Sequence, residues 1–200
     1  MCGRYEFQVE NMDDMLESAL CAGTISADRV PKGEICPGRS ALAILARNGV
    51  PTAVLMRWGF DGPHGLVINA RSETASRRSM FQGCVRAYRC LLPASGYYEW
   101  HKVTGAKYRV GSIDARNVYM AGLYLPLPDE PARFVVITRA ATGKMADLHP
   151  RTPMILTSKQ DRLDWLLRPE RAEALLADAE APNLITRAVE PEQLNMFEDI

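Results

Sequence analysis

The chain has 200 residues and carries 24 basic and 24 acidic side chains, so its formal net charge is zero at pH 7. This balance excludes binding to nucleic acid or membrane through bulk charge, although a local positive patch can still bind a phosphate chain. Five cysteines without a C-x-x-C pair argue against a disulfide framework and a structural zinc site.

The first 81 residues predict a helix, a hairpin, a strand and a second helix. Residues 11–22 form an amphipathic pattern capped by Asn11. Apolar runs within 41–60 flank Asn48 and Gly49, a dipeptide typical of a type I′ hairpin turn. A strand is expected at 65–70, and Ser72 begins a short helix over 72–81.

The rest of the chain predicts strands in the middle and helices near the end. Thr157 lies three residues before Gln160, as in a capping box, and begins a helix over 157–167. Pro169 begins another helix, over 169–179. The expected strands cover residues 89–102, 106–110, 118–125, 133–139 and 183–189.

Helices and strands do not alternate regularly, which argues against a doubly wound parallel sheet. The pattern favours an α+β fold with a single domain over residues 1–200. We expect a strongly curved, mainly antiparallel sheet or an open β-barrel, with flanking helices.

Location and bound groups can also be judged from the sequence. The first ten residues are polar and charged rather than a signal peptide, and the apolar runs are too short to span a bilayer, so a cytoplasmic protein is expected. His64, His101 and His149 show no ligand spacing, and no phosphate-cradling glycine loop is present. We expect no metal and no cofactor.

Cys2 follows the initiator methionine, so trimming of Met1 would make it the N-terminal residue. An α-amine with a pKa of ~7.7–8.0 is partly neutral near pH 7.4 and can attack an aldehyde to form an imine. The neighbouring thiol could then close a five-membered thiazolidine ring, because it is already held in place. An N-terminal cysteine is therefore a trap for aldehydes.

Three other polar residues stand beside apolar ones. Asn69 ends a buried-looking strand, Glu99 lies between aromatic residues, and His149 precedes an apolar run. Such surroundings suit a carboxylate and a histidine to acid–base work. Taken singly, an asparagine, glutamate or histidine in such a place more often has a structural role than a catalytic one. In the same way, Trp58 and Trp100 are more often core residues than platforms on which bases stack.

A cysteine with a histidine could also form a thiol hydrolase, in which the thiolate attacks an acyl carbon. The signatures of papain-like and caspase-like enzymes are absent. A protein that binds single-stranded DNA without any covalent chemistry is a third reading.

Four ordered motifs carry a resemblance to a known family. CGRY at residues 2–5, INARSETA at 68–75, SGYYEW at 95–100 and LHPRTPMIL at 148–156 resemble the SRAP (SOS response-associated peptidase) family. This chain departs from the pattern of some members at Glu34, Ser79 and Pro150.

The resemblance implies a sensor of abasic sites in single-stranded DNA, which it shields by forming a thiazolidine crosslink. Cys2 would be the residue that crosslinks, and Asn69 would orient its α-amine. Glu99 would act as acid and base, and His149 would move protons. The peptidase label would cover self-removal of Met1.

The resemblance also implies how DNA is held. Arginines would contact phosphates, Pro37 and Trp58 would line the path of the bases, and Thr138 would lie nearby. A monomer, associated with the nucleoid when bound to DNA, is expected. The arginines, including three in a positive stretch of the sequence that begins at Arg71, are Arg4, Arg71, Arg77, Arg78 and Arg151.

Overall fold

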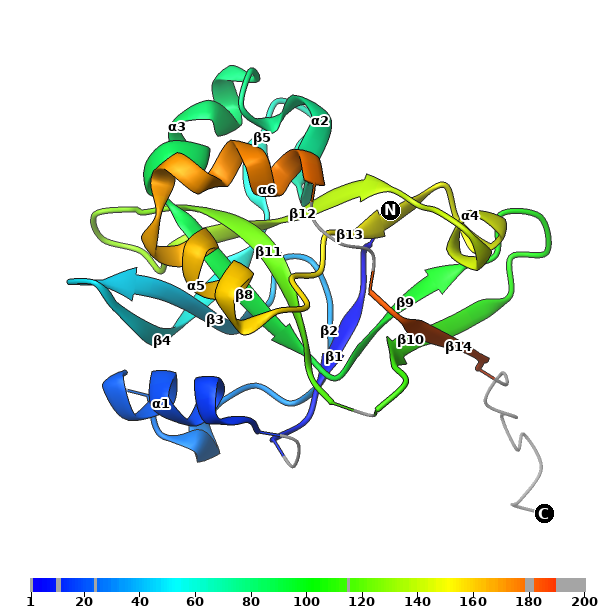
Figure 1. Ribbon diagram of the computed structural model, residues 1–200, viewed down its shortest axis with the longest axis horizontal. Helices are drawn as coiled ribbons and strands as arrows, with labels where there is room; N and C mark the ends of the chain where they lie inside the picture. The colour runs from blue at the N-terminus through cyan, green and yellow to red at the C-terminus, as the bar shows by residue number, and fades with distance from the viewer. Residues whose placement is uncertain (1, 10–11, 24, 115, 179–181, 190–200) are drawn as a thin grey trace, which may run out of the picture.

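The computed structural model describes residues 2–9, 12–23, 25–114, 116–178 and 182–189 (Figure 1). Within these residues the strands form a seven-stranded sheet, a five-stranded sheet and a two-stranded hairpin. In the view of Figure 1, helices α3, α5 and α6 gather on one side of the larger sheet and α1 lies on the other.

The larger sheet closes on itself. Its strand order is β11-β8-β3-β4-β12, and β12 also pairs with β11, so these strands form a ring. β12 runs parallel to β4 and to β7, whereas the remaining pairs are antiparallel. The strands are β3 (Ser40–Arg47), β4 (Val50–Trp58), β7 (Asn69–Arg71), β8 (Arg89–Ala94), β11 (Val118–Leu125), β12 (Arg133–Ala140) and β13 (Arg151–Pro153).

The smaller sheet is antiparallel throughout, in the order β14-β10-β9-β1-β2. The aromatic ring of Tyr5 on its inner face lies 5.3 Å from that of Trp58, which in turn stacks on Phe134 at 5.9 Å. These contacts join the two sheets. The strands are β1 (Tyr5–Phe7), β2 (Gly33–Ile35), β9 (Gly96–Trp100), β10 (Lys107–Ser112) and β14 (Leu184–Ala188), and the separate hairpin is β5 (Phe60–Gly62) with β6 (Gly65–Val67).

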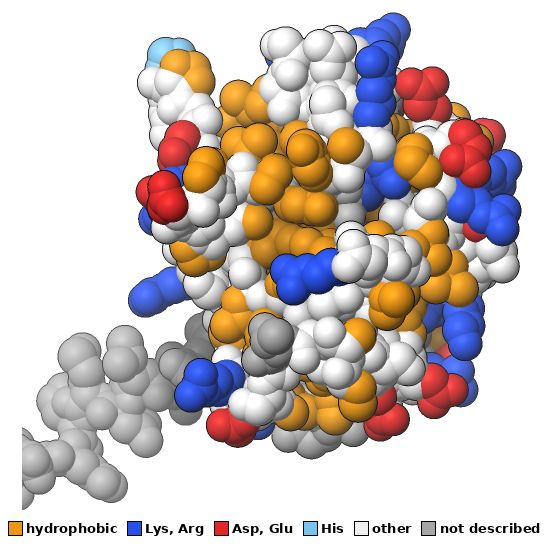
Figure 2. All heavy atoms as spheres, turned by 90° about the vertical axis from the view of Figure 1, so that its left-hand side faces the viewer, with side chains coloured by type: hydrophobic (Ala, Val, Ile, Leu, Met, Phe, Trp, Pro, Cys, Tyr) orange, Lys and Arg blue, Asp and Glu red, His pale blue; other side chains and the backbone are white. Residues whose placement is uncertain are grey.

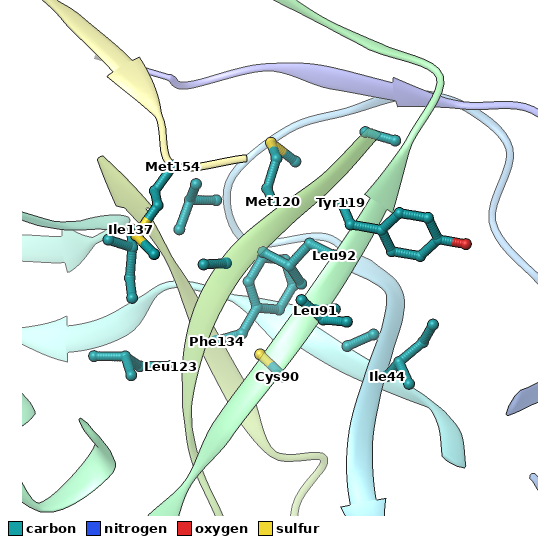
Figure 3. Packing of buried hydrophobic residues seen from close by; sticks show 14 of the residues in the cluster. Ile44, Cys90, Leu91, Leu92, Tyr119, Met120, Leu123, Phe134, Ile137 and Met154 are labelled. Atoms are coloured by element: carbon teal, nitrogen blue, oxygen red, sulfur yellow. The ribbon is translucent and has the colours of Figure 1, made fainter. Parts of the chain in front are cut away.

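Apolar side chains from the ring of strands fill its interior. Figure 3 shows Phe134 in the middle of this cluster, with Leu91, Leu92 and Cys90 around it, and all four are completely buried. The predicted α+β fold with a curved, mainly antiparallel sheet and flanking helices is thus confirmed, and the barrel is closed by the β11–β12 pair.

The first helix and the first hairpin follow the sequence pattern. Helix α1 (Asp14–Ala22) buries its apolar stripe, and the Asp13 carboxylate caps it by accepting from the backbone N–H of Leu16 at 3.0 Å. The predicted cap, Asn11, lies outside the described residues. Asn48 and Gly49 both have positive φ, 52° and 76°, as a type I′ turn requires.

Two expected elements are each divided in the structure. The helix expected at 72–81 is two helices, α2 (Ser72–Ala75) and α3 (Ser79–Ala87). The strand expected at 89–102 breaks at Ser95, because β8 belongs to the barrel and β9 to the smaller sheet. Ser95 fixes the corner, since its Oγ accepts from the backbone N–H of Gln8 at 2.9 Å.

The last two helices begin two and three residues later than expected. The cap of α5 (Lys159–Leu167) is Ser158 rather than Thr157, because Ser158 Oγ accepts from the backbone N–H of Asp161 at 2.9 Å. A 3₁₀ turn at Pro169–Arg171 precedes α6 (Ala172–Asp178). The pattern did not predict α4 (Lys144–Leu148) or the 3₁₀ turn at Ala27–Arg29.

The left-hand side of Figure 1, which holds the β3–β4 turn and the end of β11, is turned toward the viewer in Figure 2. Hydrophobic side chains gather in the middle of this face. Val50 and Leu125, from these two segments, are among the exposed large apolar residues. Among the described helices, none has the length and apolar character needed to cross a membrane.

Candidate active site and nucleic-acid interface

Cys2 lies in the interior, just before β1. It is completely buried, and its backbone carbonyl oxygen accepts a hydrogen bond from Nδ2 of Asn69 at 2.9 Å. Burial raises the pKa of the Cys2 thiol, and the charge of Glu99 raises it further. The thiol is therefore protonated at neutral pH.

Asn69 begins β7, which pairs with β12 in the wall of the barrel. Its Oδ1 atom is buried and has no hydrogen-bond partner among the described residues. An unpaired buried acceptor is destabilising by ~1–3 kcal/mol. This oxygen is thus available for a donor that arrives beside Cys2.

Trp58 is hydrogen-bonded to the backbone just before Asn69. Its indole Nε1 donates to the carbonyl oxygen of Ile68 at 3.0 Å, and the same oxygen accepts from the backbone N–H of Val136 at 3.1 Å. Trp58 is 0% exposed and offers no ring face to a base. The expectation that it lines the DNA path is therefore corrected: Trp58 holds the residue that precedes Asn69.

Glu99 points inward from β9 and is only 2% exposed. Burial raises the pKa of its carboxyl, and the nearby positive charge of His149 works in the opposite direction. Glu99 also influences the ionisation of Cys2 and of the buried Tyr97. Glu99 is thus close enough to Cys2 and His149 for their charges to interact.

His149 follows α4 and is half-buried. Its Nδ1 accepts a hydrogen bond from the backbone N–H of Arg151 at 3.0 Å. The same Nδ1 lies 3.0 Å from the carbonyl oxygen of Arg151, so it accepts from the amide when the ring proton is on Nε2 and donates to the carbonyl when Nδ1 itself is protonated. Pro150 does not prevent the bond, because the donor is the amide of the next residue.

Arg151 is bound within the protein. Its guanidinium forms two hydrogen bonds with the Glu73 carboxylate, at 2.6 and 3.0 Å, and donates to the carbonyl oxygen of Thr138 at 2.6 Å. Thr138 is 1% exposed and its hydroxyl lies 3.3 Å from the same guanidinium. Thr138 therefore supports Arg151 and presents no surface of its own to DNA.

The outer face of the smaller sheet holds Arg4. Glu34 accepts from Arg4 at 3.0 Å and from Lys107 at 2.6 Å. The Arg4 guanidinium lies 5.6 Å from the ring centre of Trp100, which is 39% exposed. Trp100 therefore has the exposed ring that Trp58 lacks, contrary to the expectation that it is part of the core.

The other predicted DNA contacts lie on exposed edges. Arg71, Arg77 and Arg78 are exposed at the end of β7 and around the α2–α3 bend. Arg77 and Arg139 line a cavity of about 520 Å³ between β12, α2 and α6. Pro37 is partly exposed in the turn that precedes β3.

The structure brings Cys2, Asn69, Glu99 and His149 together, but the sequence patterns did not single out their neighbours. Lys107 lies outside the four motifs, and Tyr97 lies within SGYYEW without a role assigned to it; both are positioned by strand pairing. Trp100 could have been assigned outward from its position directly after the inward Glu99. No group of side chains suited to hold a metal ion occurs in the part of the chain that the structure describes.

The sequence is similar to those of several curated proteins. It is 27% identical over 209 aligned residues to abasic site processing protein YoqW of Bacillus subtilis, covering 92% of this chain and 90% of that protein. It is 29% identical over 182 residues to abasic site processing protein YedK of Escherichia coli, covering 83% and 79% of the two chains.

Solved structures share the fold. A protein from Bordetella bronchiseptica matches 95% of this chain and all of its own with a TM-score of 0.76 at 22% identity. One from Bacteroides thetaiotaomicron matches 94% of this chain and 92% of its own with a TM-score of 0.74 at 18% identity. The sequence model of the SOS response associated peptidase family matches residues 1–195, so the chain belongs to the SRAP family.

Proposed function

We propose that this chain is an abasic-site sensor that crosslinks to ring-opened abasic sites in single-stranded DNA through Cys2, once Met1 has been removed. One observation carries the proposal. Asn69 holds the carbonyl of Cys2 at 2.9 Å, and its buried Oδ1 has no partner among the described residues. That oxygen would accept from the freed α-amine and aim it at an aldehyde. The names of the curated relatives support the same substrate.

The reaction would proceed in two steps. The α-amine of Cys2 attacks the aldehyde carbon of the opened sugar, and loss of water gives an imine. The thiol then adds to the imine carbon, and its proton passes to the nitrogen to complete the thiazolidine. Because the thiol enters as an intramolecular partner, it does not need to be a thiolate in the free protein.

Glu99 and His149 are proposed to move the protons. A carboxyl whose pKa is raised by burial can protonate the departing hydroxyl and later accept a proton. With Nδ1 occupied by Arg151, His149 would exchange protons through Nε2. The same groups could act when Met1 is removed and when the crosslink is reversed.

DNA would follow the exposed basic residues Arg4, Arg71, Arg77 and Arg78, with Pro37 beside its path. We assign base stacking to Trp100, since aromatic stacking combined with arginine contacts suits single strands without sequence preference. A monomer would suffice for one lesion.

A thiol peptidase acting on other proteins fits this site less well. Such an enzyme needs an accessible thiolate. The Cys2 thiol is completely buried, and its burial raises its pKa. A purely non-covalent single-strand binder would not need an unpaired acceptor on Asn69.

The test is intact mass of the purified protein before and after incubation with a single-stranded oligonucleotide that carries one abasic site. We expect a starting mass that lacks one methionine, then a denaturation-resistant species of protein plus oligonucleotide minus water. Cys2→Ala should form no thiazolidine and should still bind the oligonucleotide reversibly. A wild-type protein without Met1 that forms no adduct would sink the proposal.

A further inference from the structure

Two acidic residues lie side by side on the outer face of the smaller sheet, and they differ in how firmly they are held. Glu6 is 13% exposed at its side chain, and its oxygens accept from Arg109 and, at 2.6 Å, from Tyr98. Glu34, opposite Glu6 in the β1–β2 pair, is 38% exposed. Glu6 is thus part of a packed network, whereas Glu34 lies at the surface.

Glu34 is held by two cations. Its Oε2 lies 3.0 Å from Arg4 and its Oε1 lies 2.6 Å from Lys107. Partial burial alone would raise the pKa of Glu34, but Lys107 and Arg4 outweigh it and lower the pKa. The carboxylate therefore stays ionised and cancels one of the two positive charges.

The two cations also have aromatic neighbours that fix their positions. The Lys107 ammonium lies 4.1 Å from the ring centre of Tyr98, and the Arg4 guanidinium lies over Trp100. Arg4 and Lys107 would therefore remain in place if Glu34 moved aside. A pair of cations next to an exposed indole is suited to one phosphate and the adjoining base of a single strand.

We infer that Arg4 and Lys107 form a phosphate subsite for single-stranded DNA, and that Glu34 occupies it in the free protein and competes with the phosphate. This inference rests on the proposed function and concerns its regulation. Displacing Glu34 leaves two cations facing one phosphate, while the carboxylate turns to solvent. The ionised carboxylate near the phosphate weakens binding most at low ionic strength, where screening is least.

The test is fluorescence anisotropy with a labelled, undamaged single-stranded oligonucleotide across a range of salt concentrations. Glu34→Gln keeps the size of the side chain and removes its charge. We expect about fivefold tighter binding at low salt, and a slope of log K against log salt steeper by about 0.7, the value for one more phosphate contact with a single strand. Glu17→Gln on α1 changes the net charge equally, at a site remote from β2, and is the matched control.

A double variant identifies the cation involved. Lys107→Gln alone should change affinity little, because Glu34 already neutralises Lys107. In the Glu34→Gln background the same change should remove most of the gain. The inference alone is overturned if wild type binds the oligonucleotide and Glu34→Gln binds no tighter, or if Glu17→Gln gains as much. A wild type that binds no single strand overturns the proposed function as well.

Discussion

Asn69 is the residue at which the barrel reaches the proposed nucleophile. Its amide nitrogen holds the carbonyl of Cys2, and the strand that carries it is held by Trp58 through Ile68. A single hydrogen bond of this kind contributes ~0.5–1.5 kcal/mol. Its value to a reaction depends on where it places the amine.

Asn69→Ala removes both the donor to Cys2 and the proposed acceptor for its amine. We expect the rate of crosslinking to fall about tenfold, the factor that corresponds to ~1.4 kcal/mol lost from the oriented state. Reversible binding of undamaged single-stranded DNA should stay within about twofold of wild type. Single-turnover crosslinking followed on denaturing gels measures the rate. Asn183→Ala, an exposed asparagine beside β14, serves as control. Equal rates for Asn69→Ala and wild type would contradict this role.

Sequence patterns identified the proposed reactive residues but not their surroundings. Cys2 was recognised by its position, and Asn69, Glu99 and His149 by polar residues placed beside apolar ones. The two tryptophans were not separated by composition alone, although strand alternation after the inward Glu99 would have placed Trp100 outward. Their exposure depends on which neighbours cover each ring, and that is decided by contacts between distant strands.

At the scale of elements, α2 and β13 are tied together by one ion pair. Hydrogen bonds from Arg151 lower the pKa of Glu73 from 4.5 to about 2. Arg151 also supplies the amide that orients His149. The pair therefore connects the helix after β7 with the segment that carries the histidine.

A lowered pKa means that the ionised Glu73 stabilises the fold. This contribution is fully present above pH 4.5 and is lost as the pH falls through about 2. Glu73→Gln should lower the free energy of unfolding at pH 7 by about 1 kcal/mol, allowing for solvent screening of a partly exposed pair. Urea unfolding at pH 7 and pH 3 should show the difference between wild type and variant shrinking with acidification. A difference that grows at low pH would refute the assignment.

Element boundaries were harder to predict than element types. Thr157 and Ser158 are both good caps, and only the backbone geometry decides that Ser158 accepts from Asp161. The break between α2 and α3 carries no glycine or proline, so local propensity gave no signal for it. The Asn48-Gly49 turn was predictable because few dipeptides accept two positive φ angles in succession.

Across the whole molecule, the residues that stabilise the fold and those proposed to bind DNA form separate sets. Trp58 packs between Tyr5 and Phe134 where the two sheets meet. Trp100 stands on the outer face with Arg4 over its ring. The two indoles should therefore respond to mutation in opposite ways.

Trp58→Phe should lower the free energy of unfolding by about 2 kcal/mol, as expected for a large core side chain cut in size, and lower the melting temperature by about 4–8 °C. Its affinity for single-stranded DNA, measured below that temperature, should stay near wild type. Trp100→Ala should leave the melting temperature within about 2 °C and weaken binding about 5- to 150-fold, since stacking contributes ~1–3 kcal/mol per base. The reverse pattern would show that Trp58, and not Trp100, contacts the DNA.

The general architecture was predictable because strands and helices were segregated along the chain. Closure of the barrel was not, because it depends on β11 pairing with β12 while β12 also runs parallel to β4. The β4–β12 pair joins residues about 76 positions apart, as in Trp58 with Phe134. No local pattern encodes such a pair.

The proposed crosslink requires a cysteine that is chemically intact when an abasic site arrives. Peroxides and alkylating agents attack exposed thiolates, and they convert cysteine to forms that cannot close a ring. Cys2 is buried and protonated, whereas Cys21 on α1 is exposed. The fold thus keeps the Cys2 thiol in an unreactive state, and an oxidant would reach the exposed Cys21 before it.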